Sequence, residues 1–379
     1  MVARSDDAGE TAVPQVAGGG ISNAAAPVPF VSVVLPIRNE AAHIEACLER
    51  LLDQDYPRDR MEILVVDGRS EDGTREIVRE VQARHPSADV RLVDNPERIV
   101  PPAMNLGIQS ARFDIIVRMD GHSVPAGDYV SACVRALQRS GAANVGGVIE
   151  PVGATRFGRA VATATGHRLG AGDARYRIGG EPGDVDHVAF GSFRREAFAV
   201  VGLFDESLVR NQDDEMNMRL RAAGLRVYLD PAIRVQYTPR GTVRGLWSQY
   251  FQYGWWRIET MKRHPQSVRW RQLLPPAVTA AFLGAALLAP FWSLAAFGLA
   301  LAALTYGVLV STVALRVARP QRDAGLVALA FVVMHFGYGF GFLCHALTWG
   351  RYPYRARPPR VPRLRDAPTQ GSRVASGRS

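Results

Sequence analysis

Two short apolar runs in the N-terminal half of the chain end in acidic residues. Residues 63–66 are Ile-Leu-Val-Val and lead into Asp67, and residues 115–117 are Ile-Ile-Val and are followed closely by Asp120. Runs that are apolar on both faces are typical of buried parallel strands. In open α/β sheets, ligands bind outside the carboxyl ends of such strands. The pattern therefore predicts an α/β enzyme with a polar, metal-bearing site for a phosphorylated substrate.

The wider pattern predicts a doubly wound, mostly parallel sheet. We expect strands over residues 30–36, 61–66, 90–93 and 115–119, and helices over residues 39–52, 72–84 and 102–110. Strands that alternate with helices at this spacing are typical of parallel sheets. After residue 140 the order is less regular, and we expect strands over residues 145–150 and 187–191 and a helix over residues 214–223.

The C-terminal third contains long stretches without charge. Residues 273–315 contain no Asp, Glu, Lys or Arg. Residues 324–350 contain none of these four residue types either, and their two histidines are His335 and His345. A membrane-spanning helix needs about 20 apolar residues. The first stretch is long enough for two helices with a break near Pro290, and the second is long enough for one. A buried hairpin in a soluble domain would be shorter, so we expect about three membrane helices.

Positive charge is concentrated in the same part of the chain. After residue 239 there are 18 Lys and Arg and three acidic residues, whereas residues 1–239 contain 27 basic and 33 acidic ones. Basic residues beside membrane segments favour the cytoplasmic side and anionic lipid. We therefore expect membrane lipid, and no nucleic acid, as the partner of this region, with the catalytic domain in the cytoplasm. Three spans would place the Arg-rich tail outside, so a re-entrant last segment stays an alternative.

These observations divide the chain into five parts. We expect a disordered N-terminal tail (1–29), a catalytic domain (30–240), an amphipathic interfacial segment (241–272), a membrane region (273–350) and a basic disordered tail (351–379). The segment before the first span mixes aromatic and basic residues, which suits a helix in the membrane interface. An ordinary packed helix is the alternative. Four of its side chains are expected to face the acceptor or the membrane: Gln249, Tyr250, Trp255 and Trp256.

Acidic residues at three places are candidates for the chemistry. Asp67 can accept hydrogen bonds from a nucleotide. Asp72, in Asp-Gly-Thr, can either join it or serve as a helix N-cap or in an Asx-turn. Asp120 and His122 can face one Mg²⁺ or Mn²⁺ ion, which would neutralise a departing diphosphate. Asp213 stands in a run of three acids at a helix start, which is either a charged helix terminus or the source of a general base.

Four motifs follow one another in a characteristic order: VSVVLPIRNE, VVDGRSEDGT, RMDGH and QDDEMNMRLRAAG. Over residues 30–264 this order resembles the family 2 glycosyltransferases of the GT-A fold. The resemblance implies an inverting transfer from a nucleotide-diphosphate sugar, expected to be a UDP-sugar, with a divalent metal. The DGH variant, with FGSFRREAF, QDDE and QYFQYG, is similar to the succinoglycan-biosynthesis glucosyltransferases, which extend lipid-linked saccharides.

The resemblance also implies roles for individual residues. Pro36, Arg38 and Glu40 would border the nucleotide, and Asp67 would contact its base. Asp120 and His122 occupy the metal-binding DxD position, with His in place of the second Asp, and Asp213 is the expected base. Gln212 replaces the family's Glu before that base.

Two other functions stay open at this point. Residues 266–270 match the QxxRW signature of processive polysaccharide synthases, although Gln249 stands nearer the usual place of that glutamine. Product length separates a processive synthase from an enzyme that adds one sugar. A non-catalytic membrane scaffold that kept the fold is the other possibility, and nucleotide binding would distinguish it.

Overall fold

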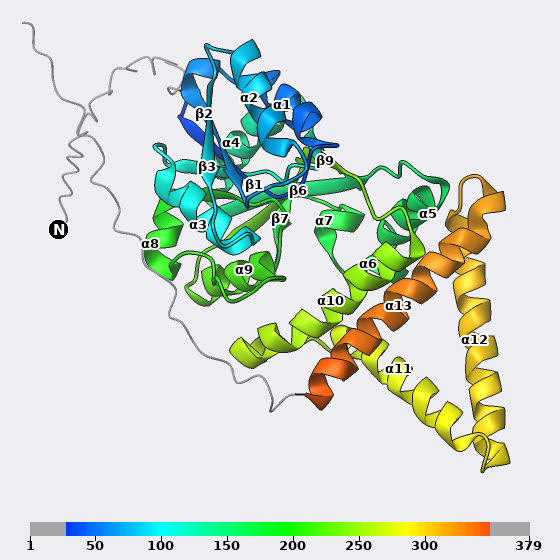
Figure 1. Cartoon of the computed structure of the whole chain (residues 1–379). Coiled ribbons are helices and arrows are strands. Elements are labelled where there is room, and N and C mark those ends of the chain that lie inside the picture. Colours follow the sequence, from blue (N-terminus) through cyan, green and yellow to red (C-terminus); the bar gives the residue numbers. More distant parts are fainter. Residues whose placement is uncertain (1–27, 349–379) are drawn as a thin grey trace, which may run out of the picture.

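The computed structural model describes residues 28–348, which contain one mixed β-sheet covered by helices and a projecting helical region (Figure 1). The strand order is β3-β2-β1-β4-β8-β6-β9-β5, with β7 paired to β9. The strands are β1 (Val31–Ile37), β2 (Met61–Asp67), β3 (Asp89–Asp94), β4 (Ile115–Arg118), β5 (Ser123–Pro125), β6 (Asn144–Pro151), β7 (Gly183–Asp184), β8 (Ser192–Arg194) and β9 (Val227–Tyr237).

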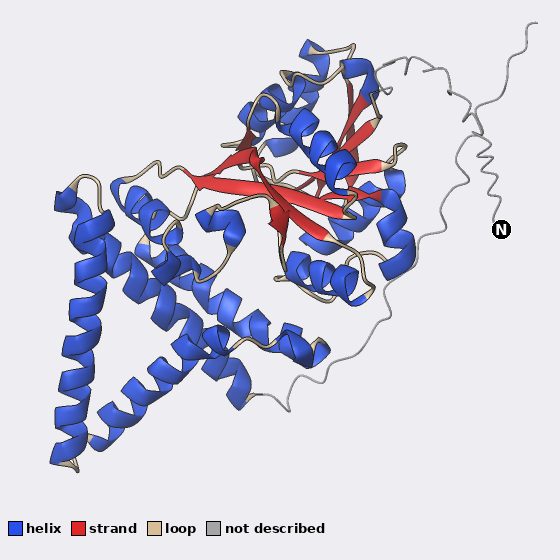
Figure 2. Ribbon diagram, turned by 180° about the vertical axis from the view of Figure 1, so that it is seen from behind, coloured by secondary structure: helices blue, strands red, loops and turns tan. Residues whose placement is uncertain are grey.

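The N-terminal half of the sheet is parallel, as predicted. β1 pairs in parallel with β2 and β4, and β2 pairs in parallel with β3. β8 lies antiparallel between β4 and β6, so the complete sheet is mixed. Figure 2 shows helices on both faces of the strands.

Alternating side chains of each strand enter two separate cores. In β2, Ile63 and Val65 pack on one face of the sheet, and Leu64 and Val66 pack on the other. The first core includes side chains of α1 (Ile44–Leu52), α2 (Thr74–Arg84) and α4 (Tyr129–Ser140). The second includes side chains of α3 (Val100–Ser110), α8 (Arg195–Val201) and α9 (Gln212–Ala222). Every strand residue of β1 and β2 is buried, which explains why their sequences are apolar runs.

The sequence prediction was wrong over residues 187–191. This segment is not a strand, and β8 begins at Ser192. The backbone turns at Phe190, whose φ is 50°, and the carbonyl of Val188 accepts a hydrogen bond from the Asn217 side chain. The longest strand, β9, was missed because Pro231 interrupts its apolar pattern, and its pairing register with β6 shifts between Gly146 and Val148.

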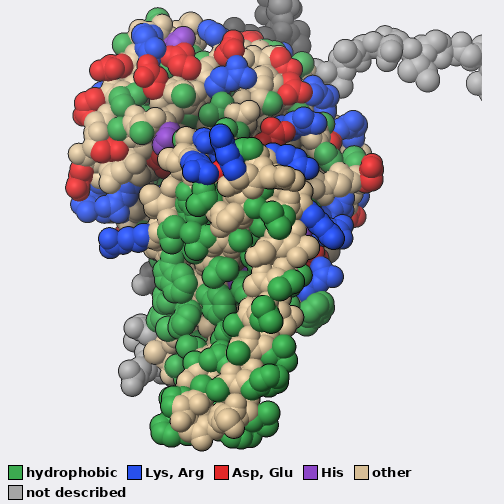
Figure 3. Space-filling model, turned by 90° about the vertical axis from the view of Figure 1, so that its right-hand side faces the viewer, with side chains coloured by type: hydrophobic (Ala, Val, Ile, Leu, Met, Phe, Trp, Pro, Cys, Tyr) green, Lys and Arg blue, Asp and Glu red, His purple; other side chains and the backbone are tan. Residues whose placement is uncertain are grey.

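Three helices are long and apolar enough to cross a membrane: α11 (Trp270–Leu288), α12 (Ser293–Val317) and α13 (Ala324–Leu347). The break expected near Pro290 is confirmed, because it lies between α11 and α12. α13 is one continuous helix and does not turn back on itself. Figure 3 shows a hydrophobic lower surface on this side of the molecule, below a charged upper part.

Helix α10 (Val243–Arg263) joins the sheet region to these apolar helices and packs beside α13 (Figure 1). Three short helices lie between β6 and β7: α5 (Arg156–Thr165), α6 (Arg168–Ala171) and α7 (Arg175–Ile178). The predicted tails fall outside the described residues, except for residues 28 and 29.

Candidate active site

A buried arginine joins two of the predicted site residues. Arg118, the last residue of β4, is only 4% exposed, and its guanidinium donates to Asp120 Oδ1 from Nε at 3.1 Å and from Nη2 at 3.0 Å. The same group donates from Nη1 to Oδ1 of Asp213, at the start of α9. Burial alone would lower the pKa of Arg118, but the charges of Asp120 and Asp213 raise it. Two carboxylates 93 positions apart in the sequence therefore share one permanent cation.

His122 is oriented by a residue from a different loop. Its Nδ1 lies 2.9 Å from Glu40 Oε1, so the Nδ1–H group donates a hydrogen bond to the carboxylate. The other ring nitrogen, Nε2, is left available for a second partner. Burial alone would lower the pKa of His122, but the Glu40 hydrogen bond and the charge of Asp120 outweigh this effect, so the pKa is raised above its usual value. A Cβ at Gly121 would meet Ile37 Cγ2 at 2.8 Å, so the loop needs glycine to approach β1 so closely.

The three consecutive acids of α9 have different partners. Asp214 accepts from Arg257 of α10 at 2.5 Å and lies 3.7 Å from His187. Glu215 pairs with Arg219 at 2.7 Å and with His264 at 3.2 Å. Only Asp213 of the three shares a partner with Asp120. The geometry thus separates residues that the sequence alone could not distinguish.

Asp67 is completely buried at the end of β2. Its carboxylate accepts hydrogen bonds from Arg75 at 2.9 Å and from the Ser70 backbone at 3.1 Å. Contact with a nucleotide base, which stays a prediction, would require this pairing to open. Asp72 joins two loops, because it accepts from the Ala41 backbone at 3.1 Å and from the Thr74 backbone at 3.2 Å. The contact with Thr74, two residues ahead, is an Asx-turn just before α2. The N-cap of that helix is Gly73 and has no side-chain cap hydrogen bond, so Asp72 is not the cap.

The other nucleotide candidates occupy different positions around the same strand end. Pro36 is buried within β1, whereas Arg38 is exposed just after it. Asn39, which the sequence analysis did not select, has a φ of 55° and ties this loop to the next. Its backbone donates to Ser70 Oγ at 2.8 Å, and its Oδ1 accepts from the Glu71 backbone at 3.0 Å.

The first half of α10 lies beside the site. Gln249 Nε2 donates to Tyr237 Oη at 3.3 Å and to Tyr253 Oη at 3.2 Å. Tyr237, at the end of β9, packs edge-on against the ring of His122 with their centroids 5.5 Å apart. Gln249 is thus connected to the candidate metal ligand through one tyrosine, whereas Trp270 of the QxxRW match is 69% exposed at the start of α11.

The remaining aromatic candidates of α10 lie in different surroundings. Tyr250 is partly buried, with a ring contact to Tyr253, and burial raises its pKa. Trp255 lies farther along the helix, with its ring 4.5 Å from that of His345 in α13. Trp256 is also partly buried. The structure therefore places Gln249 near Tyr237 and His122, and Trp255 against the apolar helix α13.

Comparison with known proteins places the chain in a family. A sequence model of Glycosyl transferase family 2 matches residues 32–202. The succinoglycan biosynthesis protein ExoA of Rhizobium meliloti (strain 1021) is 35% identical over 325 residues, which are 84% of this chain and 96% of that protein. The chain belongs to glycosyl transferase family 2. It is a glycosyltransferase, and the resemblance inferred from the four motifs is confirmed.

Other matches support the family and the fold. A dolichyl N-acetyl-alpha-D-glucosaminyl phosphate 3-beta-D-2,3-diacetamido-2,3-dideoxy-beta-D-glucuronosyltransferase of Methanococcus voltae is 28% identical over 231 residues, or 59% of this chain and 72% of that protein. The mannosyltransferase PcManGT from Pyrobaculum calidifontis, solved in complex with GDP-Man and Mn²⁺, superposes with a TM-score of 0.56 at 22% identity. The match covers 82% of this chain and 87% of that one, and it confirms the predicted GT-A fold.

The donor types that this family 2 enzyme offers, carboxylate and imidazole, are ones that a divalent cation accepts. Asp120 offers Oδ2 and His122 offers Nε2, and Glu40 holds the ring as outer carboxylates hold metal-binding histidines elsewhere. Within residues 28–348 no three His, Cys, Asp or Glu residues gather as a complete metal site. The remaining ligands would therefore come from the donor diphosphate and water, as Mg²⁺ and Mn²⁺ permit.

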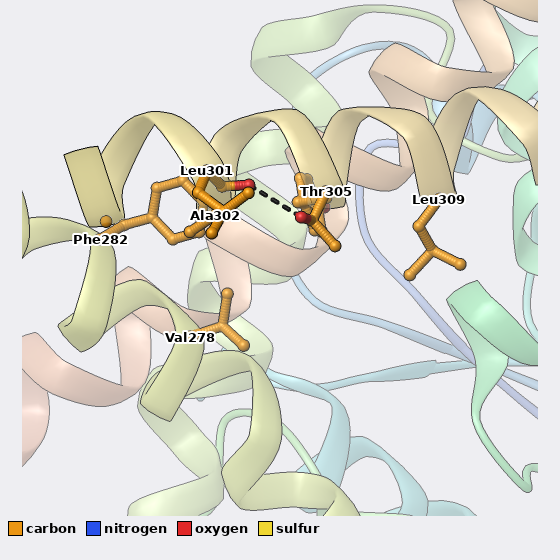
Figure 4. Close-up of a pocket in the computed structure, with 8 residues that line it drawn as sticks. Val278, Phe282, Leu301, Ala302, Thr305 and Leu309 are labelled. Atoms are coloured by element: carbon orange, nitrogen blue, oxygen red, sulfur yellow. Dashed lines mark hydrogen bonds between the residues drawn. The ribbon is translucent and has the colours of Figure 1, made fainter.

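Arg118 is the main site residue that the sequence reasoning missed. A charged residue in an otherwise apolar strand, two positions before Asp120 and hence on the same face, was the available signal. A separate apolar cavity of about 450 Å³ lies between α11 and α12 (Figure 4), lined by side chains that include Val278, Phe282 and Leu301. Because it contains no acidic side chain, it is distinct from the glycosyltransferase site.

Proposed function

We propose that this enzyme transfers a sugar, with inversion, from a nucleotide-diphosphate sugar to a hydroxyl of a lipid-linked or saccharide acceptor during cell-surface polysaccharide synthesis. The shared contact of Asp120 and Asp213 with Arg118 carries this proposal. It joins a candidate metal ligand and a candidate base in one cluster at the carboxyl end of β4. The similarity to a succinoglycan biosynthesis protein supports the polysaccharide assignment.

Asp213 is proposed as the general base. One of its oxygens is bound by Arg118, and the described residues give Oδ2 no hydrogen-bond partner. Oδ2 can therefore accept the proton of an acceptor hydroxyl while that oxygen bonds to the anomeric carbon. The bond from this carbon to the diphosphate breaks on the opposite side, which inverts its configuration.

Asp120 and His122 are proposed to hold Mg²⁺ or Mn²⁺. When bound, the cation would neutralise charge on the departing diphosphate, an effect of several kcal/mol. Arg118 holds the carboxylate of Asp120, and Glu40 sets the His122 ring, so both ligands are oriented before the metal binds. The solved GDP-Man and Mn²⁺ complex of PcManGT, which has the same fold, supports such a pairing of nucleotide and metal.

The loops after β1 and β2 are proposed to form the nucleotide side of the site. Asn39, Ser70 and Asp72 connect these two loops. Exposed Arg38 lies beside them and can meet phosphate charge. A UDP-sugar is the expected donor. The apolar helices that follow would keep this site at the cytoplasmic face of the membrane, within reach of a lipid-linked acceptor.

Substitution of Asp213 with Asn tests the proposal. We expect transfer to fall by about 10²–10⁴-fold, the usual contribution of a general base. Binding of UDP with Mn²⁺, measured by isothermal titration calorimetry, should remain. Asp114→Asn is the matched control because its side chain is 90% exposed, and it should keep full activity.

Sugar release and transfer would be measured with membranes that contain the full chain and a panel of nucleotide sugars. A fully active Asp213→Asn enzyme would remove this residue from the base role. No nucleotide binding by the unsubstituted protein at millimolar ligand would instead favour a scaffold. Products longer than one added sugar would favour a processive synthase.

A further inference from the structure

Helix α10 is bound to the catalytic domain along its length. Gln249, near its start, contacts Tyr237 of β9. Arg257 in its second half is bound to Asp214 of α9 at 2.5 Å, and Arg263 at its end donates to Ser207 Oγ at 2.9 Å. A helix with ionic partners in the domain at its middle and hydrogen-bonded partners at both ends lies against that domain and does not cross a bilayer.

Helix α13 lies directly beside α10 and in the same direction. A Cβ at Gly337 would be 3.3 Å from the Trp247 carbonyl oxygen, and a Cβ at Gly341 would overlap that of Phe251. The residue numbers of the two helices therefore increase in the same direction along the contact, so the helices are parallel. Glycines at these positions bring the two backbones into close contact, as small residues do between packed helices. Figure 1 shows the two helices running together below the sheet.

One end of α13 is tied to α5 of the catalytic domain and the other end to α10. Asp323, just before the helix, is 6% exposed and pairs with Arg156 of α5 at 2.7 Å. Near the other end, His345 lies 2.8 Å from the Trp255 carbonyl oxygen and 2.9 Å from Glu259 Oε1. A helix of 24 residues is about 36 Å long, enough for a bilayer core of about 30 Å. A crossing would therefore take one end, with its partners, to the far side.

Among the helices of residues 28–348, it is α11 and α12 that project away from the domain. They meet at a short turn and spread apart from it as the arms of an open V, as Figure 1 shows. Few residues of the apolar stretches of α11 and α12 are buried (11% and 6%), whereas 44% of those in α13 are buried. With 19 and 25 residues these helices are about 28 and 37 Å long, which matches the bilayer core.

The ends of the α11–α12 hairpin differ in chemistry. Arg269 and Arg271 precede or begin α11, and Arg316 and Arg319 end α12, so its open end is basic. Its turn contains Phe291 and Trp292, which are 86% and 54% exposed. Tryptophan is enriched at membrane surfaces, and basic residues favour the cytoplasmic one. The pocket between the two helices (Figure 4) is open and apolar, as suits contact with lipid chains.

We propose that the α11–α12 hairpin alone crosses the membrane, and that α10 and α13 lie together along its cytoplasmic surface. The chain then leaves α13 on the same side as the catalytic domain. This arrangement removes the conflict found in the sequence, because the eight Arg after residue 350 would be cytoplasmic. The inference rests on the membrane location in the proposed function, but it does not depend on the reaction or on the site residues.

Cysteine labelling of the full-length protein in spheroplasts tests this topology. Single cysteines would be placed at the hairpin turn (Trp292→Cys), at the end of α13 (Leu347→Cys) and on the catalytic domain (Asp53→Cys). Leu347 is 87% exposed, and the Asp53 side chain is 77% exposed. The three variants would carry Cys344→Ser, because Cys344 is partly exposed, whereas Cys47 and Cys133 are buried.

We expect a membrane-impermeant maleimide to label position 292 in intact spheroplasts, and positions 53 and 347 only after permeabilisation. A C-terminal green fluorescent protein on the full chain should fluoresce, and a C-terminal alkaline phosphatase should be inactive. External labelling at 347 with active phosphatase would establish three spans and overturn the proposal. Protection of position 292 in intact spheroplasts would overturn the crossing hairpin. Sugar transfer in the same membranes reports on the proposed reaction separately.

Discussion

Replacement of Arg118 with Met is the most direct test of the shared cation. The side chain is 5% exposed and pairs with Asp120 and Asp213, whose side chains are 21% and 25% exposed. Removing one partner of a buried ion pair costs about 3–5 kcal/mol, because a charge is left uncompensated. Since both carboxylates keep some contact with solvent, we expect the lower part of this range, about 3 kcal/mol.

This cost converts into a measurable shift of the melting temperature. In a domain of 150–250 residues, 1 kcal/mol corresponds to about 2–4 °C, so the Arg118→Met protein should melt about 6–12 °C lower. Thermal unfolding of the purified protein in one detergent, followed by tryptophan fluorescence, measures this shift. Arg79→Met is the control, because its pair with Glu76 is 55% and 65% exposed and should contribute about 0–1 kcal/mol.

A second substitution separates charge from packing. Adding Asp213→Asn to Arg118→Met removes one of the two uncompensated charges, so the double variant should recover about 1 kcal/mol or more relative to additivity. The reasoning would be refuted if Arg118→Met melted within the range of the Arg79 control. It would also fail if the two substitutions were simply additive, because the carboxylates would then not depend on that guanidinium.

Three further outcomes are expected. His122→Ala should weaken Mn²⁺ binding in the presence of UDP by at least 10-fold in calorimetry, and unchanged affinity would remove His122 from the metal site. Gly341→Ala should lower the melting temperature by several degrees, because its Cβ would overlap the Phe251 carbonyl, whereas Gly284→Ala, with open space around it, should not. Burial lowers the pKa of His187 below its unfolded value of about 6.5, so this residue contributes stability above pH 6.5 that is lost as pH falls through the folded pKa. The melting temperature of the His187→Gln protein should therefore fall less between pH 7.5 and 5.5 than that of the unsubstituted protein. An identical fall in both proteins would contradict this.

The sequence predicted the first half of the fold well because its signals are local. Residues 61–66 are apolar on both faces and lead into an acid, and the structure has β2 there, buried throughout. The same kind of reasoning missed β9, whose pairing depends on partners distant in sequence and tolerates Pro231. It also placed a strand over residues 187–191, where contacts from α9 bend the backbone instead.

The candidate site shows the same division. Motifs identified Asp120, His122 and Asp213, but no local pattern shows which side chains meet across the fold. The contact of Arg118 with both acids requires β4 and α9 to come together, and the pairing of Glu40 with His122 requires two loops to do so. Glu40 was predicted to border the nucleotide, and its partner in the structure is the candidate metal ligand.

The partners of α9 have a practical consequence for work with this enzyme. A protein cut at residue 240, the domain boundary expected from the sequence, would lose Arg257 and His264, which hold Asp214 and Glu215. The helix that presents the candidate base would then lose the guanidinium that binds Asp214 and the imidazole that contacts Glu215, which would keep only Arg219. Soluble fragments of this length are therefore poor reagents for kinetics. A fragment that extends at least through His264 keeps the partners of Asp214 and Glu215.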